Sequence, residues 1–169
     1  MRRGHAREPV TWRPGDVGSR RLSTEEGGPV DWQAWARQME QTDGADAFEA
    51  LFARGGLFSD PVTPWTTDVR KVANDTDSIF PDWQQRIDTI RGGDDWAVFE
   101  WTGTATFYAE GPDRPGIPIK MEGATVVEVD DEGRVTRWRD YLDTNEPTQQ
   151  IQKGMTAAGL DPGAGPKPG

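Results

Sequence analysis

The hydrophobic pattern of the chain changes period near residue 80. Before that point, apolar side chains recur at the spacing of an α-helix; after it, they alternate along long runs separated by turn residues, as in β-strands. Helices that precede an antiparallel sheet in the chain predict an α+β domain. The 169 residues leave room for one domain of ordinary size, with a core large enough to surround a cavity.

Three N-terminal helices and a short C-terminal helix are expected. The first begins after Asp31, whose side chain suits an N-cap. Its buried stripe is formed by Trp32, Trp35, Ala36 and Met39. The third helix is expected over residues 66–79, and the C-terminal helix over residues 147–158, where apolar side chains again have helical spacing.

The second helix is expected to carry Phe48, Leu51 and Phe52 on one face. We expect Gly55-Gly56 to end this helix, because glycine adopts left-handed backbone at little cost. A short strand is then expected from Leu57 to Asp60, closed by a proline.

Two β-hairpins are expected to form the rest of the sheet. The first joins strands within residues 83–109 across Gly92–Asp95, and the second joins strands within residues 117–143 across Asp131–Gly133.

Both ends of the chain lack hydrophobic periodicity. Residues 1–29 are rich in Arg, Gly, Pro and Ser and are expected to form a disordered arm, which includes His5, the one histidine. Residues 161–169 alternate Gly and Pro and are expected to form a second disordered tail. The folded domain is therefore expected over residues 30–160, and its acid–base chemistry must use groups other than histidine.

Composition excludes several classes of function. A formal net charge of -10 argues against nucleic-acid binding, which needs clustered basic side chains. Without cysteine there are no disulfides or thiolates, and this favours the cytoplasm. No apolar run is long enough to span a membrane, and no phosphate-binding loop or metal-ligand spacing is found. No cofactor is implied. Eight tryptophans are a heavy aromatic load that suits a cavity wall, a dimer face or simply the core.

Two stretches carry a resemblance to a known family. The run from Asp131 to Asp143 (DEGRVTRWRDYLD) resembles the final hairpin of limonene epoxide hydrolase, and the passage from Leu51 to Pro61 is similar to the family's entry into its pocket. Together with the order of elements, these stretches make residues 30–160 resemble the nuclear transport factor 2-like superfamily, in its SnoaL-like and limonene epoxide hydrolase-like branch.

This resemblance implies a cone-shaped, curved antiparallel sheet packed against three N-terminal helices, with a small-molecule pocket between the sheet and the helices. The branch includes polyketide cyclases, isomerases and epoxide hydrolases that need no cofactor. Dimers that form through the sheet face are common in the superfamily, and Arg139 and Tyr141 are expected on such a face here.

The hydrolase pattern is kept only in part. Asp140 stands where the hydrolase has the aspartate that activates water. Trp101 and Gly103 stand where it has an arginine and an acidic aspartate, and Phe58 and Asp60 where it has a tyrosine and an asparagine. The resemblance therefore keeps one catalytic role and puts ordinary epoxide hydrolysis in doubt.

Alternation along the last strand places Trp138, Asp140 and Leu142 on one face. By the resemblance, this face lines the pocket, where burial would raise the pKa of Asp140 toward a value useful for proton transfer. The alternative interpretation is that Asp140 is ionised and anchors a neighbouring group.

Asp60 is a second candidate catalytic carboxyl, which could share a proton with Asp140. Its alternative role is to shape a turn before Pro61. Other candidate substrate-binding residues are apolar, and core packing explains them equally well. They are Trp35, Phe58, Phe99, Trp101, Phe107 and Met121.

Two functions follow from these observations. One is a cofactor-independent enzyme of secondary metabolism, a cyclase, isomerase or epoxide hydrolase that acts on a polyketide or terpenoid-like molecule through Asp140 and Asp60. The other is a non-catalytic protein of the same fold that binds a small molecule or dimerises.

Overall fold

The computed structural model describes residues 29–109 and 116–161. The predicted N-terminal arm with His5 and the predicted C-terminal tail lie outside these residues, apart from Pro29 and Asp161 at their inner ends. In chain order the elements are α1 (Trp32–Glu40), α2 (Gly44–Ala50), β1 (Phe52–Ser59), α3 (Val69–Ile79), β2 (Gln84–Gly92), β3 (Trp96–Phe107), β4 (Ile117–Val129), β5 (Val135–Leu142) and α4 (Asn145–Ala157).

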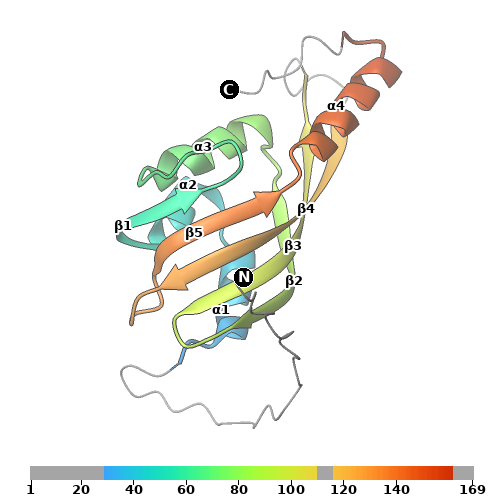
Figure 1. The fold of residues 1–169 in the computed structure, drawn as a ribbon. Coiled ribbons are helices and arrows are strands. Elements are labelled where there is room, and N and C mark those ends of the chain that lie inside the picture. Colours follow the sequence, from blue (N-terminus) through green and yellow to red (C-terminus); the bar gives the residue numbers. More distant parts are fainter. Residues whose placement is uncertain (1–28, 110–115, 162–169) are drawn as a thin grey trace, which may run out of the picture.

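The five strands form one curved sheet in the order β1-β5-β4-β3-β2, so the predicted α+β class is confirmed. The two predicted hairpins are β2–β3 and β4–β5. The sheet is antiparallel except at one edge, where β1 pairs with β5 in parallel. This pair makes the sheet mixed, whereas an antiparallel sheet was expected. Figure 1 shows α1 behind the sheet and α4 at the far end of the long strands β3 and β4.

Helix α1 forms as its sequence predicts. The Asp31 carboxylate accepts hydrogen bonds from the backbone N–H groups of Gln33 and Ala34, at 3.1 and 3.0 Å, and so satisfies donors that the first turn leaves free. The four residues of the predicted stripe are its buried residues. The third and fourth helices also form, with bounds that differ from the prediction by at most three residues.

The predicted end of the second helix is wrong. Helix α2 ends at Ala50, and strand β1 already begins at Phe52 instead of Leu57. Gly55, with a φ of 80°, lies inside this strand, where the pairing with β5 becomes irregular between Phe52 and Leu57. The left-handed glycine therefore belongs to a strand bulge and not to a helix end.

The core lies between the helices and the inner face of the sheet, by which we mean the face that carries Trp138. The indole of Trp138 lies within 5.4 to 6.5 Å of five other aromatic rings, measured between ring centroids. Those rings belong to Trp35, Phe48, Phe52, Phe58 and Phe99. Trp101 lies over Gly123, where a Cβ atom would approach Trp101 Cζ2 to 2.4 Å, so glycine is what admits the indole ring.

Candidate functional site

Strand β5 presents Trp138, Asp140 and Leu142 on the inner face of the sheet, as the alternation predicted. Trp138 is 2% exposed, and Asp140 and Leu142 are partly buried, whereas Arg139 and Tyr141 between them are exposed. Successive side chains of a strand point to opposite faces, so one strand places an acid against the core and a guanidinium in solvent.

Three side chains form a hydrogen-bond chain that ends on one oxygen of Asp140. The Trp101 indole Nε1 donates to Thr125 Oγ1 at 2.9 Å, and Thr125 Oγ1 donates to Asp140 Oδ1 at 2.5 Å. Trp138 Nε1 donates to the same Oδ1 at 2.8 Å. The carboxyl group is therefore held by two donors from two strands.

Burial among these side chains raises the pKa of Asp140 from 3.8 to about 7. The hydrogen bonds from Thr125 and Trp138 act in the opposite direction, because they stabilise the ionised form, and the charge of Asp60 raises the pKa further. The residue keeps some accessible surface, but protein atoms surround its carboxyl closely enough for desolvation to outweigh both donors. At neutral pH the protonated and ionised forms are then both populated.

The second oxygen of Asp140, Oδ2, accepts neither of these hydrogen bonds. Within residues 29–109 and 116–161, both hydrogen bonds to this carboxyl reach Oδ1, and every fully buried side-chain nitrogen or oxygen has a partner. Oδ2, which takes part in neither bond, is therefore not fully buried. Because it receives no hydrogen bond from these residues of the protein, Oδ2 is the oxygen that can exchange a proton.

Asp60 takes the turn-forming role that was the alternative to catalysis. Its Oδ1 accepts hydrogen bonds from the backbone N–H groups of Val62 and Thr63, at 2.8 and 2.5 Å, and so closes the turn after β1. Asp60 is nevertheless close enough for its charge to raise the pKa of Asp140. The structure thus brings the two predicted carboxyls near each other. Asp60 accepts hydrogen bonds from backbone N–H groups, whereas Asp140 accepts them from side chains.

The predicted apolar wall lies in the core. Trp35, Phe58, Phe99, Trp101, Phe107 and Met121 are all buried, and Leu142 is partly buried against them. The rings of Trp35, Phe58 and Phe99 pack around Trp138, and all six residues belong to one core cluster, so core packing accounts for them in this structure.

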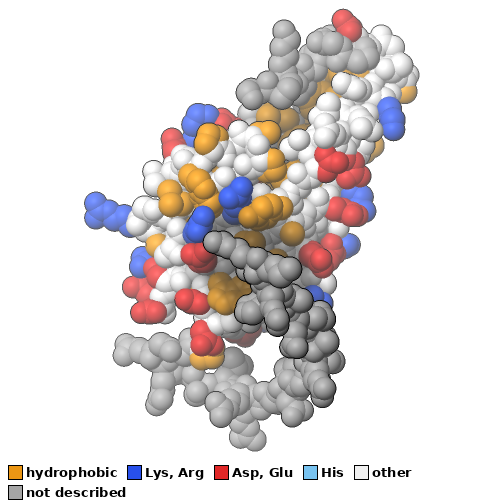
Figure 2. Space-filling model, viewed as in Figure 1, with side chains coloured by type: hydrophobic (Ala, Val, Ile, Leu, Met, Phe, Trp, Pro, Cys, Tyr) orange, Lys and Arg blue, Asp and Glu red, His pale blue; other side chains and the backbone are white. Residues whose placement is uncertain are grey.

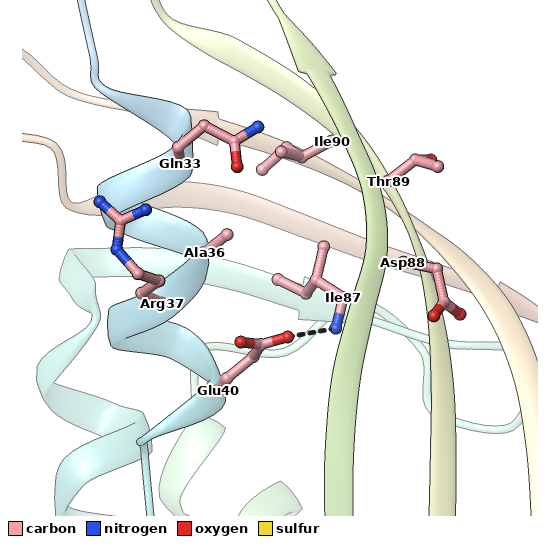
Figure 3. Close-up of a pocket in the computed structure, with 8 residues that line it drawn as sticks. All are labelled: Gln33, Ala36, Arg37, Glu40, Ile87, Asp88, Thr89 and Ile90. Carbon is pink, nitrogen blue, oxygen red and sulfur yellow. Dashed lines mark hydrogen bonds between the residues drawn. The ribbon is translucent and has the colours of Figure 1, made fainter.

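Two surface hollows are found among the described residues, and Asp140 lines neither of them. One, of about 130 Å³, is a groove between α1 and β2, where Ile87 and Ile90 point toward the helix and Glu40 accepts a hydrogen bond from the Ile87 N–H at 2.6 Å (Figure 3). The other, of about 480 Å³, is an open hollow on strands β2, β3 and β4. It is lined by Asp88, Glu100, Trp101, Thr102, Glu122, Gly123 and Ala124.

The outer face of β5 carries a second arrangement of aromatic and charged groups, which we term the basic–aromatic strip: Trp65, Arg137, Arg139 and Tyr141. The Arg137 guanidinium lies 4.5 Å from the centre of the Trp65 ring, and that of Arg139 lies 5.7 Å from Trp65 and 5.1 Å from Tyr141. Figure 2 shows basic side chains among hydrophobic ones over this part of the sheet. Arg86 on β2 pairs with Asp88 at the surface.

Thr125 is the member of the site that sequence reasoning missed. It is fully buried and lies opposite Asp140 in the β4–β5 pairing. Its position in a strand of alternating pattern carried no signal of its own, because only the strand register shows which residue faces Asp140.

Residues 32–138 match the family model for a SnoaL-like domain, which covers more than half of the chain. The chain belongs to the SnoaL-like domain family. This membership confirms the resemblance on which the predictions of fold and site were based. No curated protein shows significant sequence similarity to this SnoaL-like chain.

Solved structures agree with the SnoaL-like fold. A Catenulispora acidiphila protein with a ketosteroid isomerase-like fold, in complex with trimethylamine, is 20% identical and superimposes with a TM-score of 0.60 over 82% of this chain and 99% of that one. A candidate polyketide cyclase from Acidithiobacillus ferrooxidans is 25% identical, with a TM-score of 0.58 over 73% and 92%. An epoxide hydrolase of M. tuberculosis, similar to limonene epoxide hydrolase, is 21% identical, with a TM-score of 0.54 over 75% and 90%.

Two negative findings apply to the part of the SnoaL-like chain that the structure describes. No group of three or more His, Cys, Asp or Glu side chains is arranged to hold a metal ion. No helix there combines the length and the apolar character that crossing a membrane requires.

Proposed function

We propose that the protein is a cofactor-independent enzyme that acts on a hydrophobic small molecule by carboxylate acid–base catalysis at Asp140. The observation that carries the proposal is a carboxyl whose pKa is raised to about 7 and whose Oδ2 is free, while two donors hold Oδ1. A general acid or base works best when its pKa lies near the working pH. The candidate reactions are those of cyclases, isomerases and epoxide hydrolases, and the candidate substrates are polyketide or terpenoid-like.

In this proposal, ionised Asp140 takes a proton from a carbon acid or a water molecule at Oδ2 and returns it to the product. Asp60 assists through its charge, which raises the pKa of Asp140 and so makes the ionised carboxylate a stronger base. Both roles need no cofactor. We also propose that the protein works in the cytoplasm, an assignment supported by the absence of cysteine.

Substrate would bind against the predicted apolar wall, next to Trp138 and Leu142. Because the core around Trp138 is already packed, binding requires side chains near Asp140 to move. Leu142, the next residue on the same face of β5, is only partly buried and is therefore the least confined of the proposed binding residues. Trp35, Phe58, Phe99, Trp101, Phe107 and Met121 are the further proposed binding residues.

The test is Asp140→Asn, which preserves the shape of the side chain and can still accept both hydrogen bonds at Oδ1. With a panel of β-keto esters, polyketide-like aldol precursors and terpenoid epoxides, we expect turnover to fall by about 10²- to 10⁴-fold while ligand affinity is kept. The matched control is Asp60→Asn, whose amide oxygen can still close its turn, and which should lower turnover less. Unchanged turnover in Asp140→Asn would contradict the proposal.

The alternative is a non-catalytic protein that binds a small molecule. It is favoured by Trp101 and Gly103, which stand where the hydrolase pattern has an arginine and an acid, and by the packed interior. If ligands from the panel bind but none is turned over by the native protein at any pH between about 5 and 9, this alternative is preferred.

We further propose that the protein forms a homodimer through the outer sheet face. This face carries the basic–aromatic strip on β5 and, on the neighbouring strands β2 to β4, an open hollow with Asp88, Glu100 and Glu122. A two-fold axis through the face would set unlike charges opposite each other. Sedimentation should show a dimer that Arg139→Glu weakens; a monomer at all concentrations would contradict this.

A further inference from the structure

The hydroxyl of Thr125 has its hydrogen-bonding direction set by its neighbours. The indole N–H of Trp101 can only donate, so Thr125 Oγ1 accepts from it at 2.9 Å. A hydroxyl carries one hydrogen, and the other contact of this oxygen is Asp140 Oδ1 at 2.5 Å. Thr125 is fully buried, which leaves no water to offer it another partner. Its hydrogen therefore points at Oδ1.

Asp140 Oδ1 then faces two hydrogens, one from Thr125 and one from the indole of Trp138. A proton placed on Oδ1 would have to compete with both donors for the same lone pairs, whereas Oδ2 accepts neither of them. The two oxygens of the carboxyl are thus made unequal by the side chains around them.

We infer that Thr125, held in place by Trp101, is a positioning residue that confines the transferable proton of Asp140 to Oδ2. The inference rests on the proposed use of Asp140 in proton transfer. It assigns a role to a residue that touches no substrate and acts only through the carboxyl. The arrangement leaves Oδ2 as the reacting oxygen and stabilises the ionised form through Oδ1.

The test compares Thr125→Val, which removes the hydroxyl at nearly constant shape, with Thr125→Ser, which keeps it. In protein labelled with ¹³C at aspartate and ¹⁵N at tryptophan, the Asp140 carboxyl and the Trp138 indole signals are followed from about pH 4 to about pH 9. We expect Thr125→Ser to titrate like the native protein, and the midpoint of Thr125→Val to lie about one pH unit higher, because a donor to the ionised form is lost. Equal midpoints for valine and serine would overturn the inference.

Thr125→Val leaves the buried indole N–H of Trp101 without an acceptor and can lose stability for that reason alone. The double variant Trp101→Phe/Thr125→Val removes both polar groups and keeps the measurement possible. We expect its Asp140 midpoint to match that of Thr125→Val; a native midpoint in a folded double variant would also overturn the inference.

The titration needs no substrate, so its result is separate from that of the proposed function. If the midpoint is raised in Thr125→Val but turnover is unchanged in Asp140→Asn, the role of Thr125 in positioning the proton is supported. Catalysis by Asp140 is then rejected. Where substrate is turned over, Thr125→Val should lower kcat and move the pH profile upward with little change in KM. A pH profile that stays at its native position would count against the inference.

Discussion

The two faces of strand β5 combine tryptophan with charge in opposite ways. On the inner face, the edge of the Trp138 ring donates a hydrogen bond to the Asp140 carboxylate, away from most solvent. On the outer face, the flat side of the Trp65 ring supports the guanidinium of Arg137, and Trp65 is 38% exposed. Tryptophan therefore meets a carboxylate in a desolvated environment and a guanidinium in a hydrated one.

On the inner face, burial has a larger effect on the pKa of Asp140 than the hydrogen bonds from its neighbours. Water offsets the cost of charge on the outer face, where a cation–π contact contributes about 0.5 to 1 kcal/mol. On the inner face two donors do not compensate for the loss of water, and the pKa of Asp140 rises to about 7. Four variants sharpen or break this contrast.

The largest expected effect is that of Trp138→Ala, which removes a ring packed against five others. We expect the free energy of unfolding to fall by about 3 to 5 kcal/mol, because a large cavity is left in the core. Urea-induced unfolding followed by circular dichroism measures the change. A loss of less than about 1 kcal/mol would mean that the inner face is no better packed than a surface.

The next effect is a pH dependence that Asp140→Asn removes. Since the pKa of Asp140 is higher in the folded than in the unfolded chain, its contribution to stability is fully present below about pH 4 and is lost as the pH rises to about 7. As the pH rises across this window, the native protein should therefore lose stability relative to Asp140→Asn, by at most about 4 kcal/mol in unfolding free energy. Asp82, Asp88 and Asp130, whose pKa values are lowered, titrate alike in both proteins and cancel. If the unfolding free energies of the two proteins changed in parallel with pH, the raised pKa of Asp140 would be contradicted.

Gly123→Ala tests how closely the inner face is packed. The added methyl group would meet the Trp101 ring and displace it, with a cost of about 1 to 3 kcal/mol in unfolding free energy. Ala124→Ser, at the neighbouring residue on the outer face, is the control and should change stability by less than about 0.5 kcal/mol. Equal losses for the two variants would show that the contrast between the faces is wrong.

The smallest effect is expected for Trp65→Ala on the outer face. It removes the support of two exposed guanidinium groups and should cost less than about 1 kcal/mol in the stability of the monomer. The unfolding midpoint in urea at low protein concentration measures this. A loss of stability as large as that of Trp138→Ala would mean that Trp65 is packed in a core, which its exposed position contradicts.

Local patterns predicted the parts of the fold that depend on neighbouring residues. The cap at Asp31, the stripe of α1 and the inward position of Asp140 all follow from spacing along one element. The start of β1 did not follow, because Leu51 and Phe52 continue the apolar face of Phe48 at helical spacing. What extends the chain there is pairing with β5, about 80 residues later, and no local signal reports it.

The partner of Asp140 was hidden for a related reason. If the register at Val129 and Val135 continued unchanged, Ala124 would lie opposite Asp140. An irregularity between Glu128 and Val129 shifts the register by one residue and brings Thr125 there instead. A bulge of one residue therefore decides whether the carboxyl meets a methyl or a hydroxyl group, and the turn sequence alone does not show it.

The central claim, that burial keeps a proton on Asp140 near neutral pH, is tested most directly by the ¹³C titration of this carboxyl in the native protein, assigned with Asp140→Asn. The account predicts a midpoint of about 7, with the Trp138 indole signal moving at the same pH. A midpoint near the ordinary value of 3.8 would contradict the account and remove the basis for catalysis at this site.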